Sequence, residues 1–299
     1  MELWHAIILG LVEGITEYLP ISSTGHLILT SALLKLNEPA QVKASVDAFN
    51  IVIQGGAILA VLGLYRARVL QMIRGLLGKD AAGLKLAINI IIAFLPAAIL
   101  GVLLDDWIDA HLFFAGPVLA ALFLGGLWMI LLDRWRNKHL KEEARASTPE
   151  SESRFRHDIE DLTPLQALLI GFAQCLAMWP GTSRSMMTIA GGTMLGLKPR
   201  AAAEFSFLLG LPTLGGACVY KLYKNITESA DANVPNLFEQ LGWTAVIVGT
   251  AVATVSAALA VKWLVSFLTK HGLAPFGWYR IALTALLGAL IATGLVQIA

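Results

Sequence analysis

Two carboxylates lie one helical turn apart in a segment that is otherwise apolar enough to be buried in a membrane. Glu13 and Glu17 are four residues apart, so in a helix they share one face. An ionised residue at bilayer depth costs about 2.5–3.5 kcal/mol on insertion scales, so such a pair indicates a function. Four carboxylate oxygens suit a hard divalent cation, and we predict Glu13 and Glu17 as ligands of Mg²⁺ or Ca²⁺.

The residues that follow carry hydroxyl groups and an imidazole. The stretch Ser22-Ser23-Thr24-Gly25-His26 is small, polar and turn-forming. An imidazole can act as a base, an acid or a nucleophile near neutral pH, and a neighbouring imidazole can activate a serine. We predict Ser23 as a nucleophile with His26 as its proton partner, with direct attack by His26 as the alternative. Glu17 belongs to the same catalytic group, and Ser22 is expected to contact the substrate.

A second interrupted segment carries the only Lys or Arg between Arg156 and Lys198, which is Arg184. Its guanidinium presents five donors in a rigid fork that suits phosphate oxygens. Gly181 would let the backbone approach a ligand closely. Hydroxyl groups that could assist are those of Ser183, Ser185 and Thr188.

Charge indicates which ligand these groups would bind. Two glutamates alone would repel a phosphate, whereas a metal ion together with Arg184 reverses the sign of the local field. Pyrophosphate then fits better than a neutral ligand, and phosphoryl transfer is the chemistry that such groups support. The apolar setting indicates a substrate with a lipid tail. The alternative for Arg184 is simple neutralisation of Glu13 or Glu17.

Composition supports a membrane setting. The chain has 299 residues, of which 57% are hydrophobic and 14% charged. Soluble domains carry about 25% charged residues, so the chain is predicted to be a polytopic membrane protein. A net charge of +1 argues against nucleic acid as a partner. Cys175 and Cys218 fall in apolar stretches and are interpreted as core residues.

Hydropathy predicts an all-α protein with six transmembrane helices and two further interrupted segments. The interrupted segments, about 5–35 and 164–195, contain Pro, Gly and hydroxyl residues. Broken backbone at membrane depth requires burial in protein or a wet cavity, so we predict two re-entrant helical hairpins. The six predicted spans lie near 47–65, 86–104, 113–133, 201–223, 243–265 and 281–298. On the first of them, Asn50 and Gln54 could line the pocket or form a polar interhelical contact.

Loop charges predict the orientation. Basic residues are concentrated in 66–85 and 134–163, which the positive-inside rule places in the cytoplasm together with 266–280. Loops 105–112 and 225–242 lack Lys and Arg and are predicted outside. Near the cytoplasmic edge, Glu204 is expected to form a local salt bridge with Lys198 or Arg200.

This topology implies an inverted repeat within a single membrane domain, residues 1–299. The halves 1–133 and 164–299 are joined by a cytoplasmic linker, 134–163. A weak echo supports the repeat, because three residues of the first half align without gaps on three of the second: Gly10, Glu13 and Ser22 on Gly171, Gln174 and Ser183. Inverted repeats with broken helices place the functional site where the hairpins meet, near the membrane midplane.

At these residues the sequence resembles the undecaprenyl-diphosphate phosphatase family, also called bacitracin resistance proteins. The resemblance spans nearly the whole chain. The segments that carry it are Glu13-Gly14-Ile15-Thr16-Glu17, Ser22-Ser23-Thr24-Gly25-His26 and Pro180-Gly181-Thr182-Ser183-Arg184-Ser185 with Thr188. Any one of these segments alone would be weak evidence for the family.

The resemblance implies an enzyme of the bacterial plasma membrane that hydrolyses undecaprenyl pyrophosphate to the monophosphate. It thereby implies recycling of the carrier lipid of peptidoglycan synthesis, competition with bacitracin, a divalent metal, and a site open toward the periplasm. The partners expected are the polyprenyl pyrophosphate lipid and, as a candidate assembly, a second copy of the chain.

Two other functions compete with this interpretation. An isoprenoid-lipid flippase or transporter would use the same midplane pocket, although translocation needs no nucleophile. A phosphatidic-acid-type phosphatase would need a second catalytic histidine after its arginine motif. The next histidine after Arg184 is His271, in a predicted loop, which disfavours that family.

Overall fold

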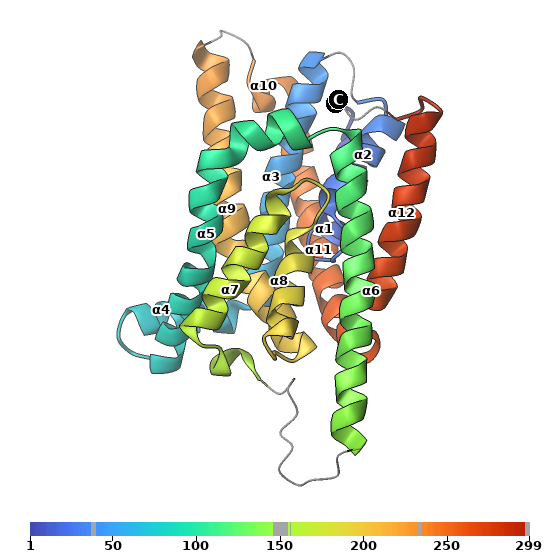
Figure 1. Ribbon diagram of the computed structural model, residues 1–299. Coiled ribbons are helices and arrows are strands. Elements are labelled where there is room, and N and C mark those ends of the chain that lie inside the picture. Colours follow the sequence, from blue (N-terminus) through green and yellow to red (C-terminus); the bar gives the residue numbers. More distant parts are fainter. Residues whose placement is uncertain (37–39, 146–154, 156, 232–234, 297–299) are drawn as a thin grey trace.

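The computed structural model describes residues 1–36, 40–145, 155, 157–231 and 235–296, and these form a bundle of helices without a strand (Figure 1). The α-helices are α1 Leu3–Thr16, α2 Ser23–Leu33, α3 Ala40–Leu64, α4 Arg66–Leu76, α5 Ala81–Leu112, α6 Ala115–Arg145, α7 Pro164–Cys175, α8 Arg184–Met194, α9 Pro199–Asp231, α10 Leu237–Leu241, α11 Trp243–His271 and α12 Ala274–Ala292. Two short 3₁₀ turns occur at Ile159–Asp161 and Leu176–Met178.

Six of the described helices are long and apolar enough to cross a membrane, which confirms the predicted number of spans. The apolar stretches are Val46–Leu64, Ala81–Ile108, Ala115–Glu142, Pro199–Thr227, Trp243–His271 and Ala274–Ala292. Many of their large apolar side chains are exposed on the outside of the bundle, as expected for a surface that faces lipid.

The two interrupted segments fold as pairs of short helices, α1–α2 and α7–α8. Each pair packs its first helix against a long helix of the opposite half: α1 lies against α11, and α7 lies against α5. Both crossings require glycine, because a Cβ at Gly10 would contact the backbone of Gly249, and a Cβ at Gly171 would contact the backbone of Ala93. This arrangement is consistent with the predicted re-entrant hairpins and inverted repeat.

The second helix of each pair begins at a serine with the same unusual backbone. Ser22 precedes α2 with φ 71° and ψ 99°, and Ser183 precedes α8 with φ 77° and ψ 115°. Non-glycine residues rarely adopt positive φ, and such strain occurs at functional sites. Each serine hydroxyl accepts a hydrogen bond from the backbone N–H three residues later, so both serines are helix N-caps. The turns touch, because Ser185 Oγ donates to Leu19 O at 2.9 Å.

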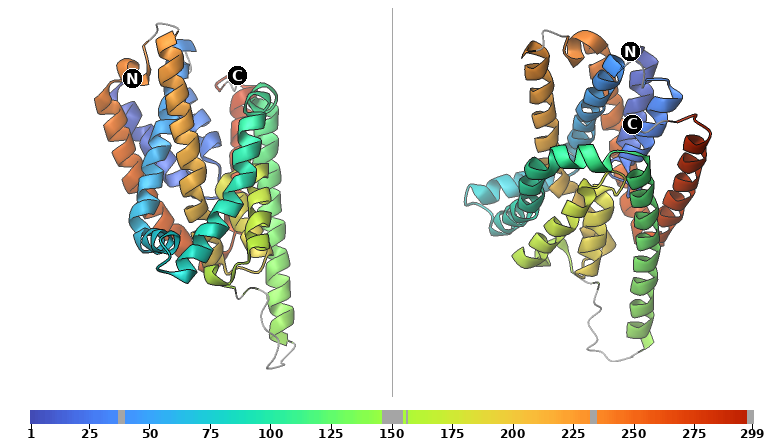
Figure 2. Two further views of the ribbon diagram at one scale, coloured as in Figure 1. Left: turned by 90° about the vertical axis from the view of Figure 1, so that its left-hand side faces the viewer. Right: turned by 45° about the horizontal axis from the view of Figure 1, so that its top comes forward.

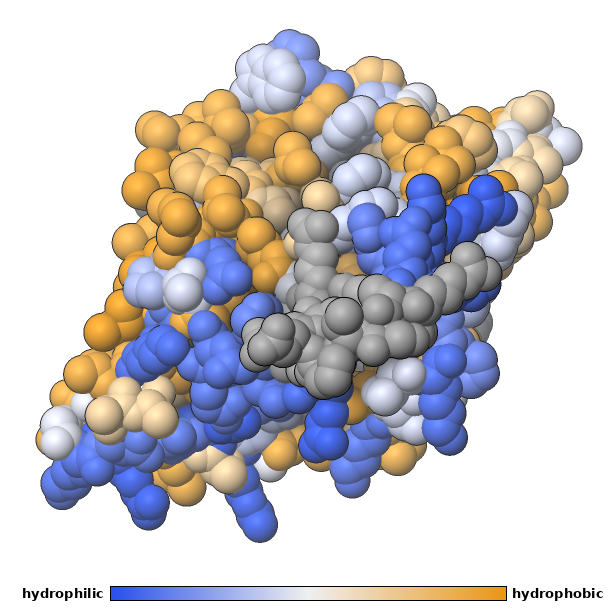
Figure 3. Space-filling view, turned by 60° about the horizontal axis from the view of Figure 1, so that its bottom comes forward, coloured by the Kyte–Doolittle hydropathy of each residue, from blue (hydrophilic) through white to orange (hydrophobic). Residues whose placement is uncertain are grey.

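The two ends of the bundle differ in the way that the loop charges predict. In Figures 1 and 2, α4, the end of α6 and the α11–α12 turn lie at one end. The α5–α6 turn, α10 and both chain ends lie at the other. The end that carries α4 is rich in hydrophilic side chains (Figure 3). Which end faces the cytoplasm stays a prediction.

Arg68 ties the amphipathic helix α4 to this hydrophilic end. Its guanidinium lies 2.7 Å from carboxylate oxygens of both Glu204 and Glu160. Partial burial lowers the pKa of Arg68, but these hydrogen bonds raise it more, so that the pKa lies above its ordinary value. The predicted salt bridge of Glu204 with Lys198 or Arg200 is therefore wrong, because Arg68 on α4 is the ion-pair partner of Glu204.

The predicted loops are shorter than hydropathy indicates, and three of them illustrate it. Residues 105–112 continue α5, and 134–145 continue α6 into the predicted linker, of which 146–154 and 156 lie outside the described residues. Between α11 and α12 only residues 272–273 are not helical, where a loop over 266–280 is predicted. Charged residues ended the predicted spans early, although helices tolerate them at a membrane surface or when their charges are satisfied.

Candidate active site

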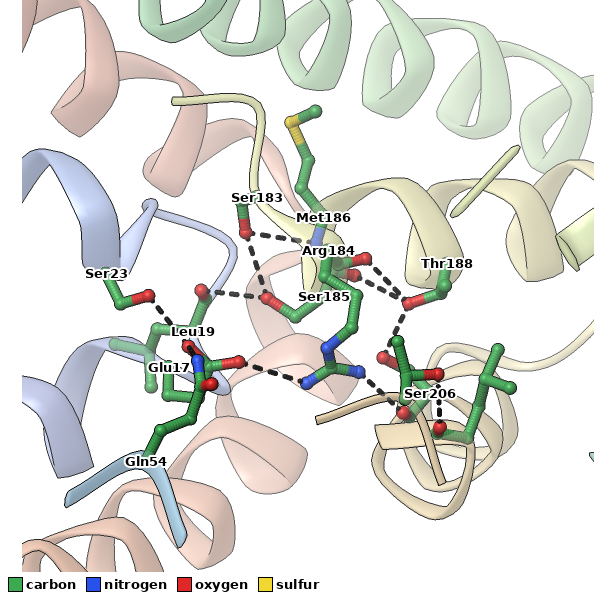
Figure 4. A network of polar contacts seen from close by, with 12 residues as sticks. Glu17, Leu19, Ser23, Gln54, Ser183, Arg184, Ser185, Met186, Thr188 and Ser206 are labelled. Atoms are coloured by element: carbon green, nitrogen blue, oxygen red, sulfur yellow. Dashed lines mark hydrogen bonds and ion pairs between the residues drawn. The ribbon is translucent and has the colours of Figure 1, made fainter. Parts of the chain in front are cut away.

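Glu17 lies at the centre of a polar network built from both hairpins and from α3 (Figure 4). Its Oε2 accepts hydrogen bonds from Ser23 Oγ at 2.7 Å and from Gln54 Nε2 at 3.3 Å. Its Oε1 faces Arg184 Nη2 at 3.5 Å. The acidic residue of the first half and the guanidinium of the second half therefore meet, as the inverted repeat predicts, in a site that is largely buried.

Ser23 is placed to lose its proton to Glu17. The strained turn at Ser22 brings Ser23, the first residue of α2, back over the end of α1, where Glu17 follows the helix. A serine hydroxyl hydrogen-bonded to a carboxylate can be activated as a nucleophile. Ser23 is only partly buried, whereas Glu17 is buried, so the hydroxyl lies on the accessible side of the pair.

The predicted Ser23–His26 pair is not formed. His26 Nδ1 lies 2.7 Å from the backbone oxygen of Ser22, one turn back on α2. Its Nε2 lies 2.7 Å from the hydroxyl of Tyr279 on α12. The carboxylate of Glu17 accepts the hydrogen bond of the serine hydroxyl instead, because the turn points Ser23 toward α1 and the helix points His26 toward α12.

Arg184 has hydrogen-bond donors that could bind an anion. Nη1 donates to Ser206 O at 2.9 Å, and the guanidinium carbon lies 5.5 Å from the ring centre of Tyr18. Nε has no hydrogen-bond partner among the described residues, and Nη2 has none beyond its ion pair with Glu17. Unpaired buried donors are costly, which favours a bound group that would satisfy them.

The predicted substrate-binding hydroxyls mainly hold the second hairpin together. Ser185 is buried and is bonded to Leu19 O, and its Oγ lies 3.0 Å from Ser183 Oγ. Thr188 Oγ1 donates to Arg184 O at 2.9 Å and lies 2.6 Å from Ser206 Oγ, so it supports the helix that carries the guanidinium. Of these hydroxyls, that of the partly exposed Ser183 lies nearest the accessible side.

Gly181 is required by packing. Its φ is +95°, and a Cβ there would lie 2.7 Å from the backbone oxygen of Val118 on α6. The missing side chain therefore lets the turn pack closely against α6, and the contact of Gly181 with a ligand stays a prediction. The turn is also held by Arg280 on α12, which is fully buried and donates to the backbone oxygens of Gly181 and Thr182.

Glu13 has the features of a cation ligand. It is 1% exposed, and neither carboxylate oxygen has a hydrogen-bond partner within the described chain. A buried carboxylate without partners is unstable unless it binds a cation or a proton. Among the described residues no three His, Cys, Asp or Glu side chains lie close enough to hold a metal. Together with phosphate oxygens and water, the two carboxylates would supply oxygen ligands of the kind that a divalent ion requires.

Sequence reasoning missed three contributors to this site. Ser206 on α9 gave no signal, because an isolated serine in an apolar span is common. Tyr279 and Arg280 fall in a predicted loop, and a loop position gives no signal for a site inside the bundle. Gln54, a candidate pocket residue from the sequence, donates to Glu17, whereas Asn50 Oδ1 is buried without a partner in the described part of the chain.

Comparison with known proteins agrees with this geometry. The family model of the bacitracin resistance protein BacA matches residues 6–286. The chain is 46% identical to the undecaprenyl-diphosphatase of Sorangium cellulosum over 283 residues, 95% of this chain and 84% of that protein. It is 42% identical to the undecaprenyl-diphosphatase of Deinococcus radiodurans, over 99% of this chain and 98% of the relative. The chain therefore belongs to the bacitracin resistance protein BacA family.

Proposed function

We propose that the protein is an undecaprenyl-diphosphatase, which hydrolyses undecaprenyl pyrophosphate to undecaprenyl phosphate and inorganic phosphate. The observation that carries the assignment is the meeting of Glu17, Ser23 and Arg184 inside a membrane-spanning bundle. Relatives of the same length are named for this activity. The reaction recycles the lipid carrier of peptidoglycan synthesis and confers resistance to bacitracin.

Ser23 is the proposed nucleophile. Its oxygen attacks the terminal phosphorus while its proton passes to Glu17. The bond from this phosphorus to the bridging oxygen breaks, and the lipid monophosphate leaves with the electron pair. Arg184 turns its unpaired donors to the oxygens of the phosphoryl group in transfer, whose negative charge it stabilises. Water then hydrolyses the phosphoserine, and His26 is the proposed proton carrier for this second step.

Glu13 and Glu17 are the residues that would hold Mg²⁺ or Ca²⁺. Bound there, the ion would neutralise the pyrophosphate charge and polarise its oxygens. Glu17 would serve both roles, since its Oε1 remains free of a short hydrogen bond while Oε2 accepts two. Glu13 would contribute with both of its unpartnered oxygens.

Phosphate release from undecaprenyl pyrophosphate in detergent tests the assignment. Detergent offers no second compartment, so a flippase or transporter alone would release no phosphate. Excess chelator should abolish release, and full activity with chelator would rule out the cation. Trapping the phosphoenzyme separates the nucleophiles: an acid-stable adduct indicates Ser23, whereas an acid-labile, base-stable adduct indicates His26.

The proposed setting is the bacterial plasma membrane, with the site open toward the periplasm. Support comes from α2, which lies at the bundle end opposite the basic helix α4 (Figure 1). In a background without Cys175 and Cys218, an impermeant thiol reagent applied to intact cells should label Glu239→Cys and not Lys79→Cys. The reverse pattern would overturn the orientation. A homodimer is the proposed assembly, and a monomer mass from light scattering in detergent would contradict it.

A further inference from the structure

Tyr279 joins the last helix of the bundle to the histidine of the first hairpin. Its hydroxyl lies 2.7 Å from His26 Nε2, and the two rings are parallel within 1° with centroids 5.6 Å apart. The tyrosine is 45% exposed, so it lies on the outer side of the site. The distance between the hydroxyl and Nε2 is well within hydrogen-bond range.

The other contact of the imidazole fixes its tautomer. His26 Nδ1 lies 2.7 Å from the backbone oxygen of Ser22, and a carbonyl oxygen can only accept. Nδ1 must therefore carry a proton in the neutral ring. Nε2 then holds the lone pair, and Tyr279 donates its hydroxyl hydrogen to it. The one nitrogen that can take up a proton is the one that Tyr279 contacts.

The neighbour of Tyr279 holds it in this position. Arg280 donates to the backbone oxygens of Ala121 and Leu122 on α6, and to those of Gly181 and Thr182 in the second hairpin. These bonds fix α12 against α6 and against the turn that precedes Arg184. The backbone at Tyr279 is therefore fixed relative to α6 and to the second hairpin.

We propose that Tyr279 is a positioning residue for His26, an inference that rests on the proposed function. It holds the ring with Nε2 as the reactive nitrogen and keeps this nitrogen away from Ser23, so that Glu17 alone receives the serine proton. The hydroxyl leaves Nε2 when the ring serves the hydrolytic step. A residue with this role affects turnover through His26 and has little influence on substrate affinity.

The variant Tyr279→Phe removes the hydroxyl and keeps the aromatic ring. We expect kcat to fall about tenfold, the effect of losing one productive hydrogen bond, with KM changed less than about twofold. Tyr223→Phe is the matched control, because Tyr223 is an exposed tyrosine on α9, and it should retain wild-type kcat. Elution volume and melting temperature should match those of the wild type in both variants.

A double-mutant cycle separates positioning from a structural role. In a His26→Ala background, Tyr279→Phe should cause no further loss of kcat. An equal loss in both backgrounds, or an unchanged kcat in the single variant, would overturn the proposal.

A second readout does not depend on turnover. Diethyl pyrocarbonate modifies the unprotonated nitrogen of imidazole, and mass spectrometry of the peptide that contains His26 measures the rate at this site. Tyr279→Phe should raise that rate several-fold because Nε2 is released, and Tyr223→Phe should leave it unchanged. An unchanged rate in Tyr279→Phe contradicts the proposed contact. If the wild type released no phosphate, the proposed function would fail, while this modification rate would still report on the contact.

Discussion

The two hairpins share a backbone and differ in chemistry. Both begin with a helix that crosses a long helix at a glycine, and both enter their second helix through a serine N-cap with φ above 70°. When Ser22 is aligned with Ser183, the residue after the cap is Ser23 in the first hairpin and Arg184 in the second. The residue after the strained serine is therefore the proposed nucleophile in the first hairpin and a cation in the second.

Other aligned positions follow the same division. The first hairpin carries proton carriers and carboxylates where the second carries an amide or a thioether: Glu13, Glu17 and His26 align with Gln174, Met178 and Met187. Glu13 has no partner among the described residues, whereas the Oε1 of Gln174 accepts a hydrogen bond from Thr213 at 3.3 Å. This division agrees with the proposal that one hairpin performs the reaction while the other binds the anion.

The largest effect should come from the nucleophile of the first hairpin. Ser23→Ala removes the attacking oxygen, and we expect kcat to fall by about 10³-fold or more, equivalent to about 4 kcal/mol of transition-state stabilisation. Phosphate release measures it. Ser31→Ala on the same helix is the control, because the buried Ser31 Oγ has no hydrogen-bond partner in the described structure. Near wild-type activity in Ser23→Ala would instead indicate His26 as the nucleophile.

The stability of the second hairpin should depend on Arg280. Arg280→Met leaves the buried backbone oxygens of Gly181 and Thr182 without these donors, at about 1–3 kcal/mol each. We expect the free energy of unfolding to fall by about 3 kcal/mol, measured by thermal denaturation in detergent. Arg66→Met, at an exposed position of α4, should change it little. A wild-type melting temperature in Arg280→Met would show that the turn needs no such clamp.

The anion-binding role of the second hairpin depends on the shape of the guanidinium. Arg184→Lys keeps the charge and loses the fork, so we expect kcat/KM to fall about 10²-fold, or about 2.7 kcal/mol. Steady-state kinetics of the purified protein would show it. Arg66→Lys serves as the control. Unchanged kinetics in Arg184→Lys would restrict Arg184 to a structural ion pair with Glu17.

The smallest effect should come from Glu13, whose carboxylate replaces the amide of Gln174 at the aligned position. Glu13→Gln copies the amide of Gln174 and removes one negative charge, so the concentration of Mg²⁺ for half-maximal activity should rise about tenfold. Gln174→Met, at the aligned position, should leave that concentration unchanged. Equal behaviour of the two variants would contradict the division of roles between the hairpins.

Much of the fold is predictable because its determinants are local in the sequence. Apolar runs predict the six spans, and the interruptions around Ser22 and Ser183 predict the hairpins. The meeting of Glu17 and Arg184 is what the predicted inverted repeat implies, since that topology would bring the two interruptions to one place. These inferences need only periodicity, charge and topology.

Details that depend on side-chain direction were not predictable. The partner of Ser23 is decided by the backbone at Ser22, whose positive φ has no signal in the sequence. Arg280 ended the predicted span because an arginine is costly in a membrane, yet four backbone oxygens satisfy it. The Tyr279–His26 contact joins residues 253 positions apart, and only the packing of α12 brings them together.

The placement of Arg280 on α12 has a consequence for biosynthesis. Of the described helices, α12 is the last to leave the ribosome, and it supplies the donors that fix the turn before Arg184. A nascent chain with the earlier helices inserted would hold Glu17, Ser23 and Arg184 but would lack the donors that fix the turn before Arg184. Competence for hydrolysis should therefore arise late, when the final helix enters the bilayer, so that partly synthesised chains leave the carrier lipid untouched.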